Sequence, residues 1–506
     1  MFKKILIANR GEIAVRILRA CRELSIRTAA VFSDADRGAL HVRLADEAYP
    51  IGPAPSRESY LSIDKLMDVS RRAGCDALHP GYGFLAENPA LPRACKDAGV
   101  TFIGPPAEAM EAMGSKTAGK QLARRADVPT VPGTSEAIDN PEEVQALARS
   151  MGYPVVLKAI AGGGGKGMRV VDNDSEFTAA WRDAASEALN AFGDPRMFLE
   201  KYLLKPRHIE IQVFADAHGR VVSLGERECS VQRRHQKVIE EAPSPVVTPD
   251  LRRRMGDAAV RLARAGGYVN AGTVEFLVDA QLNFYFLEVN TRLQVEHPVT
   301  EQVTGLDLVK LQIAIAAGHR LPFAWESIAP RGHAMELRLY AEDPDNNFFP
   351  CPGKILARNA PTGPGVRLDE GVYEGYTVPL EYDPLLSKLI AWGNSREETI
   401  SRLRRALDEY TITGIRTNVS LFRRILGEAE FLTSNIHTNW LDELLARPHP
   451  PAEAPRAGTE EAALLAAALW SSRKPDSSAG GRPGSEMDQM SEWKRDGRRQ
   501  QLDRMP

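Results

Sequence analysis

Two stretches of the sequence combine residue types that could bind phosphate and a divalent cation. The first is a glycine loop, residues 158–167, with the sequence KAIAGGGGKG. Four consecutive glycines let backbone N–H groups approach an anion, and Lys158 and Lys166 add positive charge. The GxxxxGK[ST] pattern of a Walker A loop is absent. The loop therefore predicts a flap over phosphates, with a flexible surface hairpin as the alternative.

The second stretch pairs carboxylates across a predicted hairpin. Two β-rich runs, 272–276 and 284–292, flank the turn residues 279–283. Such a hairpin sets Glu275 near Glu288, and the two-residue period of a strand puts Glu288 and Asn290 on one face. Facing carboxylates repel unless a proton or a cation lies between them. Mg²⁺ prefers carboxylate oxygens completed by phosphate oxygens, so these residues predict a metal site. The alternative interpretation is a pair of exposed hairpin glutamates.

Charged residues follow directly in the run RLQVEHP, residues 292–298. Arg292 and Glu296 could supply an anion clamp and a base, although a surface Arg–Glu pair fits equally well. The run ERECSVQRRHQK, residues 226–237, is also ambiguous, because a charge run is usually a solvated face.

The elements that must position these residues begin with a β-α-β rhythm. Short apolar strands are predicted at 5–8, 29–32, 77–78 and 100–103, and residues 13–24 repeat apolar side chains at helical spacing. This rhythm predicts a parallel sheet covered by helices. The first turn lacks GxGxxG, so a dinucleotide is not indicated.

The chain then changes character twice. A helical stretch at 110–128 contains Lys116, and strands at 155–158 and 169–171 flank the glycine loop. From about residue 205 the strands alternate as in an antiparallel sheet, with His208, Glu210 and Gln212 on one face. The last sixty residues have a helix candidate at 460–470 within linker-like sequence, which indicates a partner-docking or a disordered tail.

Composition narrows the class of protein. The 506 residues suffice for several domains, and 43% hydrophobic with 26% charged residues is ordinary for a soluble protein. A net charge of −3 does not indicate a nucleic-acid-binding protein. Five scattered cysteines argue against a disulfide framework and a zinc site. No apolar run reaches the roughly 20 residues of a membrane helix, and the N-terminus has no signal-peptide pattern, so we expect a cytoplasmic enzyme.

The order and spacing of the motifs resemble the ATP-grasp superfamily and, within it, biotin carboxylase. The resemblance extends over about residues 1–445. The matching stretches are IANRGEIAVRILRAC (7–21), HPGYGFLAEN (79–88), MGSK (113–116), GGGGKGM (162–168), EKYL (200–203), PRHIEIQV (206–213), QRRHQKVIEEAP (232–243), NTRLQVEHPVTE (290–301), AEDP (341–344) and PGKI (352–355).

The resemblance implies an α/β fold of the ATP-grasp type. The expected divisions are an N-terminal Rossmann-like biotin carboxylase domain (1–113), a helical linker (114–131), a glycine-loop lid (132–204), the large ATP-grasp subdomain with a mixed α+β C-terminal domain (205–445), and the tail (446–506).

The resemblance also assigns ligands. The residues expected to bind ATP are Lys116, Lys158, Gly164, Gly165, Glu200, Lys201, Tyr202, Leu203, His208, His235, Glu275 and Glu288. For His208 and His235, a structural hydrogen bond is the alternative. Two Mg²⁺ (or Mn²⁺) ions are expected on Glu275, Glu288 and Asn290.

For the second substrate, the resemblance implies a bicarbonate site at Lys237, Arg292, Gln294 and Val295. Glu296 matches the base that deprotonates bicarbonate, and attack on ATP gives carboxyphosphate. Carboxyphosphate releases CO₂ and phosphate, which takes the ureido proton of biotin. Arg338 matches the arginine that stabilises the biotin enolate, and its permanent charge suits that role. The expected catalytic residues are Lys237, Arg292, Glu296 and Arg338.

Partners follow from an absence in the sequence. No Met-Lys-Met occurs for attachment of biotin, so we expect the biotin carboxyl carrier protein and the carboxyltransferase to be separate polypeptides. Arg19 and Glu23 on the first helix are candidates for a homodimer contact, with a solvated face as the alternative. The final carboxyl acceptor is an acyl-CoA, such as acetyl-CoA or propionyl-CoA, or pyruvate. The carboxyltransferase determines which one is used, so this sequence does not identify it.

Three other interpretations stay open at this point. Another ATP-grasp ligase, such as one forming carbamoyl phosphate, should lack the set of Arg292, Glu296 and Arg338. A nucleotide-binding regulatory subunit is disfavoured by the intact candidate residues. A scaffold docked through its tail would need no ATP turnover.

Overall fold

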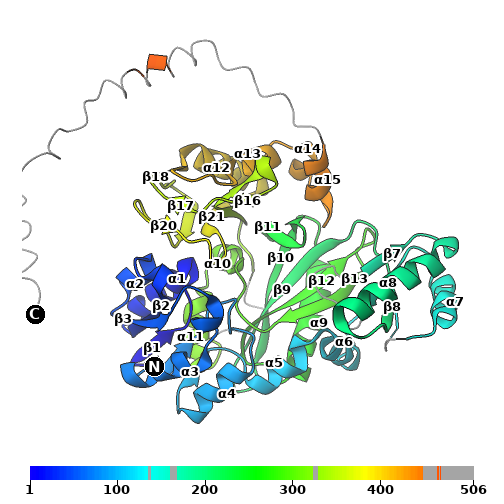
Figure 1. Ribbon diagram of the computed structural model, residues 1–506, viewed down its shortest axis with the longest axis horizontal. Coiled ribbons are helices and arrows are strands. Elements are labelled where there is room, and N and C mark those ends of the chain that lie inside the picture. The colour runs from blue at the N-terminus through cyan, green and yellow to red at the C-terminus, as the bar shows by residue number, and fades with distance from the viewer. Residues whose placement is uncertain (135–137, 160–167, 323–328, 448–463, 466–467, 469–506) are drawn as a thin grey trace, which may run out of the picture. The chain divides into compact units, whose positions relative to one another are not determined.

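The computed structural model describes residues 1–134, 138–159, 168–322 and 329–447, together with positions 464, 465 and 468 (Figure 1). Residues 1–446 form one compact unit and residues 447–506 a second. In the second unit Leu464, Leu465 and Ala468 are helical and exposed. The rest of the predicted helix 460–470 lies outside the described residues. Among the described helices, none is both long and apolar enough to cross a bilayer.

The N-terminal residues form a five-stranded parallel sheet in the order β3-β2-β1-β4-β5. Its elements are β1 (Lys4–Ile7), α1 (Gly11–Glu23), β2 (Arg27–Ser33), α2 (Leu40–Leu44), β3 (Glu47–Gly52), α3 (Ile63–Ala73), β4 (Ala77–His79), α4 (Ala90–Asp97) and β5 (Thr101–Phe102). The predicted parallel sheet is confirmed. Strand β3 was not predicted, because Pro50 interrupts its pattern; an edge strand tolerates the missing N–H of proline.

The helical stretch predicted at 110–128 comprises two helices, α5 (Ala107–Gly114) and α6 (Lys116–Arg125). Ser115 takes an extended conformation between them, and its hydroxyl accepts a hydrogen bond from the Ala118 N–H. A serine at this position is an N-cap, which ends one helix and begins the next. Lys116 is thereby placed in the first turn of α6; its side chain lies outside the described residues.

The glycine-loop region is a small antiparallel sheet in the order β7-β6-β8. Its elements are α7 (Pro141–Met151), β6 (Val155–Ala159), β7 (Met168–Val171), α8 (Phe177–Phe192) and β8 (Met197–Lys201). The two strands predicted beside the glycine loop are confirmed as β6 and β7. Residues 160–167, which include Gly164 and Gly165, lie outside the described residues.

The largest sheet is antiparallel, as predicted, with the order β13-β12-β9-β10-β11-β14-β21-β19. Its strands are β9 (Arg207–Ala215), β10 (Val221–Arg233), β11 (Gln236–Ala242), β12 (Asn270–Val278), β13 (Phe284–Asn290), β14 (His333–Tyr340), β19 (Val366–Glu370) and β21 (Leu385–Gly393). Its helices are α9 (Pro249–Ala265), α10 (His297–Thr304), α11 (Leu308–Ala316), α12 (Arg396–Glu409), α13 (Val419–Ile425), α14 (Ala429–Leu432) and α15 (Trp440–Ala446).

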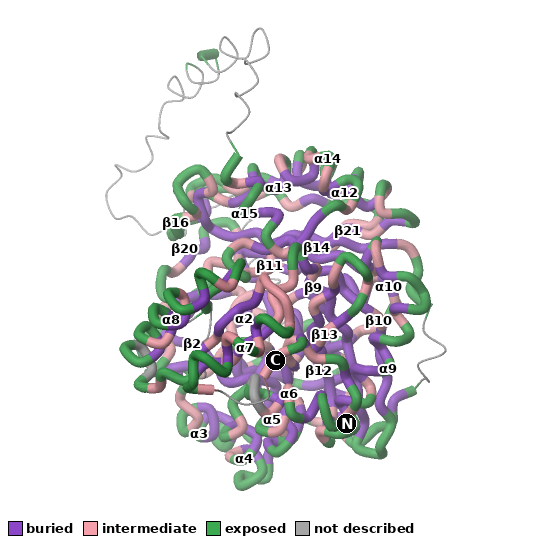
Figure 2. Tube along the Cα trace, turned by 90° about the vertical axis from the view of Figure 1, so that its right-hand side faces the viewer, coloured by how far each residue is buried: buried purple, intermediate pink, exposed green. Residues whose placement is uncertain are grey.

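Short strands complete the unit: β15 (Glu342–Asp343), β16 (Phe349–Pro350), β17 (Gly353–Lys354), β18 (Ala357–Asn359), β20 (Thr377–Val378) and β22 (Thr411–Thr413). The strands of the large sheet are mostly buried, and they run as purple tube in Figure 2. One face packs its apolar side chains against α5, α6 and α9 around Phe276 and Phe286. The other face carries polar side chains and is the subject of the next section.

Candidate active site

A β-bulge puts the predicted carboxylates on the polar face of the large sheet. Strands β12 and β13 pair Glu275 with Glu288 and Phe276 with Phe286, so Leu287 is an extra residue on β13. Without this bulge, Phe286 and Glu288 would share a face, because they are two residues apart. With it, Phe286 enters the core while Glu288 and Asn290 lie beside Glu275. The predicted pairing of Glu275 with Glu288 is confirmed.

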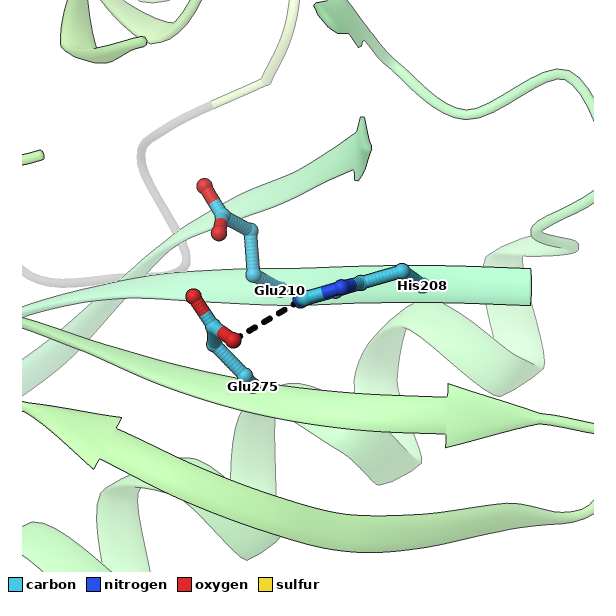
Figure 3. A group of neighbouring side chains, drawn as sticks. All are labelled: His208, Glu210 and Glu275. Atoms are coloured by element: carbon cyan, nitrogen blue, oxygen red, sulfur yellow. Dashed lines mark ion pairs between the residues drawn. The ribbon is translucent and has the colours of Figure 1, made fainter. Parts of the chain in front are cut away.

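Strand β9 supplies the next row of side chains, with His208, Glu210 and Gln212 on one face as predicted. Figure 3 shows His208 of β9 paired with Glu275 on the neighbouring strand β12, while the Glu210 side chain rises from β9 beside them. The Nε2 atom of His208 is 2.9 Å from the Glu275 carboxylate, and its Nδ1 is 2.7 Å from the Gln232 amide. All three side chains of Figure 3 are buried.

Lys237 is the centre of the site. Its Nζ lies 2.5 Å from Glu210, 2.8 Å from Glu275 and 2.7 Å from Glu296. We call these four residues the Lys237 cluster. Burial alone would lower the pKa of Lys237, but its three carboxylate neighbours outweigh burial and hold that pKa well above its ordinary value. The ammonium group therefore stays charged and gathers three carboxylates around one point.

Glu296 bridges two cations. It follows β13 at the N-terminus of α10 and has no exposed surface. One of its oxygens faces Lys237, and the other lies 2.8 Å from the Arg338 guanidinium on β14. Burial would raise the pKa of Glu296, but its cationic neighbours, Lys237 and Arg338 foremost, hold that pKa well below its usual range. The group is a carboxylate poised between two donors.

Glu275 is ionised for a similar reason. Burial would raise its pKa, but Lys237 and then His208 lower it. Its Oε1 also accepts hydrogen bonds from the amides of Asn290, at 2.8 Å, and Gln294, at 3.2 Å. An ionised carboxylate beside Glu288 and an amide carbonyl is the oxygen-rich set that Mg²⁺ or Mn²⁺ takes. The residues present thus fit a divalent cation.

Arg292 is held from outside the large sheet. Its Nε donates to Glu87, at 2.9 Å, and its Nη1 donates to Gln294, also at 2.9 Å. Glu87 belongs to the HPGYGFLAEN stretch of the N-terminal region, and it also accepts the Thr291 N–H. A described cavity of about 520 Å³ is lined by Glu87 together with Glu288 and Asn290. Arg292 therefore lies between the predicted metal ligands and the N-terminal region.

The ATP-site candidates of the small sheet converge on Glu200, which is buried on β8. Lys158 at the end of β6 donates to one carboxylate oxygen at 2.5 Å, and Lys120 on α6 pairs with the other. Lys201 and Tyr202 next to it bond the backbone at Gly152 and Pro154. The segment Glu200–Leu203 thus links the small sheet to β9.

The remaining predicted residues are less tightly gathered. His235 is exposed at the two-residue turn between β10 and β11, where it and Arg234 both have positive φ. The carbonyl of Val295 accepts a hydrogen bond from Lys388, at 2.9 Å. Arg19 and Glu23 are exposed on α1, and Glu23 pairs with Lys310.

Two buried residues of the site, Arg227 and Glu240, were not predicted as site residues. Arg227 on β10 has no exposed surface and pairs with Glu210, while its Nη1 donates to Gln212 at 2.7 Å. Glu240 on β11 accepts from Arg338 Nε at 2.6 Å. Arg227 occurs in the charged run 226–237, which sequence alone could equally assign to a solvated face, and Glu240 follows three residues after that run. Two β-bulges in the pairing of β10 with β11 hide the alternation that would have revealed burial.

Three family models together match nearly all of the first unit. They are described as "Biotin carboxylase, N-terminal domain" (1–110), "Carbamoyl-phosphate synthase L chain, ATP binding domain" (115–324) and "Biotin carboxylase C-terminal domain" (336–443). Among curated proteins, the "Biotin carboxylase" of Halalkalibacterium halodurans is 54% identical over 431 residues, which are 85% of this chain and 95% of that protein. The chain belongs to the biotin carboxylase family. The predicted family is confirmed.

Other relatives agree with this assignment. A pyruvate carboxylase subunit of Methanothermobacter thermautotrophicus is 54% identical over 88% of this chain and 90% of its own length. The biotin carboxylase of Campylobacter jejuni, solved as a β,γ-ATP complex, superposes with a TM-score of 0.82 at 46% identity, covering 88% of this chain and 99% of that one.

A second solved structure is informative about ligands. The biotin carboxylase domain dimer of Hydrogenobacter thermophilus 2-oxoglutarate carboxylase, in complex with MgADP, ADP and bicarbonate, has a TM-score of 0.81 at 45% identity, covering 89% of this chain and all (100%) of that one. These likenesses confirm the predicted ATP-grasp fold of the biotin carboxylase type. The domain boundaries and the role of each residue stay predictions.

Proposed function

We propose that this chain carboxylates carrier-bound biotin with ATP and bicarbonate, by way of carboxyphosphate. One observation carries the proposal beyond family membership: the Glu296 carboxylate lies between Lys237 and Arg338, on the same buried face as Glu275. An anion-binding cation and a permanent guanidinium therefore both lie within hydrogen-bond reach of one base. An ATP-grasp ligase without a biotin step would not need Arg338 at this point.

On the ATP side, the proposed phosphate-binding residues are Lys116, Lys158 and, in the glycine loop, Gly164 and Gly165. Glu200, Lys201, Tyr202 and Leu203 line the adenine end, and His208 and His235 lie near the nucleotide. Glu275, Glu288 and Asn290 hold Mg²⁺ or Mn²⁺. When bound, the metal neutralises charge on the transferring phosphoryl group.

On the bicarbonate side, Lys237, Arg292, Gln294 and Val295 receive the anion, and Glu296 removes its proton. The depressed pKa of Glu296 makes it a weak base while Lys237 and Arg338 both face it. Bicarbonate takes a share of these cations and adds a like charge, so the proton affinity of Glu296 rises as substrate binds. Deprotonation is thereby coupled to occupancy of the site.

The deprotonated bicarbonate oxygen attacks the γ-phosphorus, forming carboxyphosphate as the bond to ADP breaks. Carboxyphosphate then divides into CO₂ and phosphate. A phosphate oxygen takes the ureido N–H proton of biotin, and the nitrogen attacks CO₂. Arg338 stabilises the negative charge on the ureido oxygen, because its guanidinium keeps its charge even when buried.

The partners that we propose are a biotinylated carrier and a carboxyltransferase, as in the multi-subunit carboxylases named among the relatives. The curated relatives include named subunits of pyruvate and methylcrotonoyl-CoA carboxylases, so the final acceptor depends on the transferase. We further propose a homodimer through α1, with Arg19 and Glu23 at its surface, and a cytoplasmic location.

The test is phosphate release from MgATP by the purified chain, with bicarbonate and free biotin each added or omitted. The proposal expects turnover that requires bicarbonate and increases with biotin. Turnover indifferent to biotin would instead indicate another ATP-grasp ligase, and ATP binding without turnover would indicate a regulatory subunit or a strict need for the carrier.

A further inference from the structure

Beside the Lys237 cluster lies a pair of buried carboxyl groups that the proposed reaction does not use. Glu240 on β11 and Glu336 on β14 are directly opposite each other in the antiparallel register, and neither has any exposed surface. Opposite residues of an antiparallel pair project from the same face with Cβ atoms about 5 Å apart. We call Glu240 and Glu336 the carboxyl pair.

The two members of the pair have different surroundings. Glu240 Oε1 accepts a hydrogen bond from Arg338 Nε at 2.6 Å, whereas its Oε2 accepts none from the described residues. Both oxygens of Glu336 are buried and likewise accept no hydrogen bond from the described residues. A buried carboxylate without a hydrogen bond is costly, and protonation lowers that cost by removing the charge. Geometry alone therefore separates an anchored carboxylate from one that favours a proton.

The charges facing the pair come from four elements. Arg338 on β14 and Lys388 on β21, which are register partners, are its cations. Glu296 at the start of α10 faces both members, and Lys237 faces Glu240 from its own strand. Arg338 also forms an ion pair with Glu296. Lys388 lies 3.4 Å from the Glu12 carboxylate and donates a hydrogen bond to the Val295 carbonyl. Two shared cations cannot keep every one of these carboxyl groups ionised.

We propose that Glu336 is a protonated, neutral acid in the working enzyme and that Glu240, when ionised, is a positioning residue that orients the Arg338 guanidinium. Glu240 Oε1 lies 2.6 Å from both Nε and Nη2 of Arg338, and the same Nη2 lies 2.8 Å from Glu296. A guanidinium held at both Nε and Nη2 has one orientation, whereas one held at Nη2 alone can rotate. This inference rests on the proposed function, in which Arg338 faces the ureido oxygen of biotin.

The titration directions agree with this arrangement. Burial raises the pKa of Glu240 to about 7, with Arg338 opposing the rise. Burial raises the pKa of Glu336 well above its ordinary value, with Lys388 too weak to offset it. Glu336 is thus neutral at working pH, and Glu240 gains its charge as the pH rises through about 7. Arg338 becomes fixed over the same interval.

The experiment compares Glu240→Gln with Glu336→Gln, two isosteric changes at opposite positions of one register pair. Free-biotin-dependent phosphate release should fall about 10- to 100-fold in Glu240→Gln, the usual value of a lost charged hydrogen bond. Bicarbonate-dependent release without biotin should change far less. Glu336→Gln should stay within about threefold, since an amide resembles a neutral acid.

The pH profile supplies a readout that a merely structural role would not move. Biotin-dependent release by the unmodified chain should rise through pH 7, and this rise should disappear in Glu240→Gln. Equal losses in the two variants, or an unchanged profile in Glu240→Gln, would overturn the inference.

A spectroscopic arm separates this inference from the proposed function. The unmodified chain should show an infrared carbonyl band of a protonated carboxylic acid that is absent from the spectrum of Glu336→Gln. The difference between the two spectra should contain this band whether or not the chain turns over biotin. No loss of that band would refute the neutral Glu336. If the band is lost but the unmodified chain shows no response to biotin, the proposed function fails while the proton assignment stands.

Discussion

The Lys237 cluster and the carboxyl pair contain the same residue type at the same depth, yet their protons behave in opposite ways. Glu275 and Glu296 have depressed pKa values, whereas Glu240 and Glu336 have raised ones. Burial acts alike on all four. The difference is the supply of cations: the first group surrounds an ammonium of its own, and the second shares Arg338 and Lys388 with other partners.

The comparison teaches how one sheet can supply two kinds of acid. Groups that must accept a proton or bind a cation are kept ionised by a dedicated ammonium. Glu336, which is assigned no role in the reaction, carries a proton and needs no counter-charge. Both kinds lie within a few strands of each other, so local charge balance, and not depth, divides their roles.

Removing the Lys237 ammonium should have the largest effect on activity and stability, because it removes the difference between the Lys237 cluster and the carboxyl pair. In Lys237→Met three buried carboxylates lose their shared cation, so the pKa values of Glu275 and Glu296 should rise towards those of the carboxyl pair. We expect a loss of about 10³-fold in bicarbonate-dependent phosphate release. We also expect the free energy of unfolding to fall by about 3–5 kcal/mol, as for a broken buried ion pair.

Denaturant unfolding and phosphate release measure both effects, and Lys65→Met, at an exposed lysine of α3, is the matched control. If Lys237→Met unfolds at the same denaturant concentration as the unmodified chain, the ammonium does not organise the cluster.

A milder change at Glu296 should separate charge from shape within the cluster. Glu296→Gln keeps an oxygen towards Lys237 and Arg338 but has no proton-accepting carboxylate. Bicarbonate-dependent phosphate release should fall by about 10²-fold or more, the usual value of a general base. ATP affinity, measured by nucleotide titration, should stay close to that of the unmodified chain. A parallel loss of ATP affinity would indicate that Glu296 organises the nucleotide site instead.

Much of this site could be predicted, and the reason lies in local sequence. Glu275, Glu288 and Asn290 belong to one hairpin, and His208 and Glu210 to one strand, so pairing and period suffice to gather them. Lys237, Glu296 and Arg338 come from three separate elements. Their convergence followed only from the resemblance, because strand order is a long-range property.

What could not be predicted depends on bulges and on charge balance. A strict two-residue period would place Phe284, Phe286, Glu288 and Asn290 on one face, and only the bulge at Leu287 divides them. The same holds for Lys237 and Glu240, which are three residues apart and share a face because Val238 is an extra residue in the pairing with β10. Strand β3 escaped prediction because its proline is tolerated only at an edge.

The carboxyl groups with raised pKa values should reveal themselves in the pH dependence of stability. Glu12 on α1 is the clearest, since burial raises its pKa from 4.5 to about 7 despite Lys388. The folded chain keeps this proton up to about pH 7, whereas the unfolded chain loses it near pH 4.5. Stability therefore falls as pH rises between those values, by roughly 3 kcal/mol.

Glu12→Gln should flatten this decline between pH 5 and pH 8, as measured by denaturant unfolding at each pH, with the exposed Glu58→Gln as control. Glu275 and Glu296 have depressed pKa values, so their contribution is lost only as pH falls below the ordinary glutamate value. Glu12→Gln should leave that acid limb in place. A decline as steep as in the unmodified chain would show that Glu12 does not titrate in this window.

The smallest expected effect lies at the rim of the Lys237 cluster, where solvent weakens each charge. Arg292 reaches the cluster through Gln294 and Asn290 and is held from the N-terminal region by Glu87, whose side chain is 40% exposed.

Glu87→Gln keeps an acceptor for Arg292 Nε but removes its charge. An exposed ion pair contributes at most about 1 kcal/mol, so we expect the KM for bicarbonate to rise only about twofold to fivefold, with kcat nearly unchanged. Glu111→Gln, which breaks the exposed pair with Arg93, is the matched control. A fall in kcat without a change in KM would contradict this prediction. It would show that Arg292 stabilises the transition state, so that the rim contributes to catalysis as much as the buried cluster does.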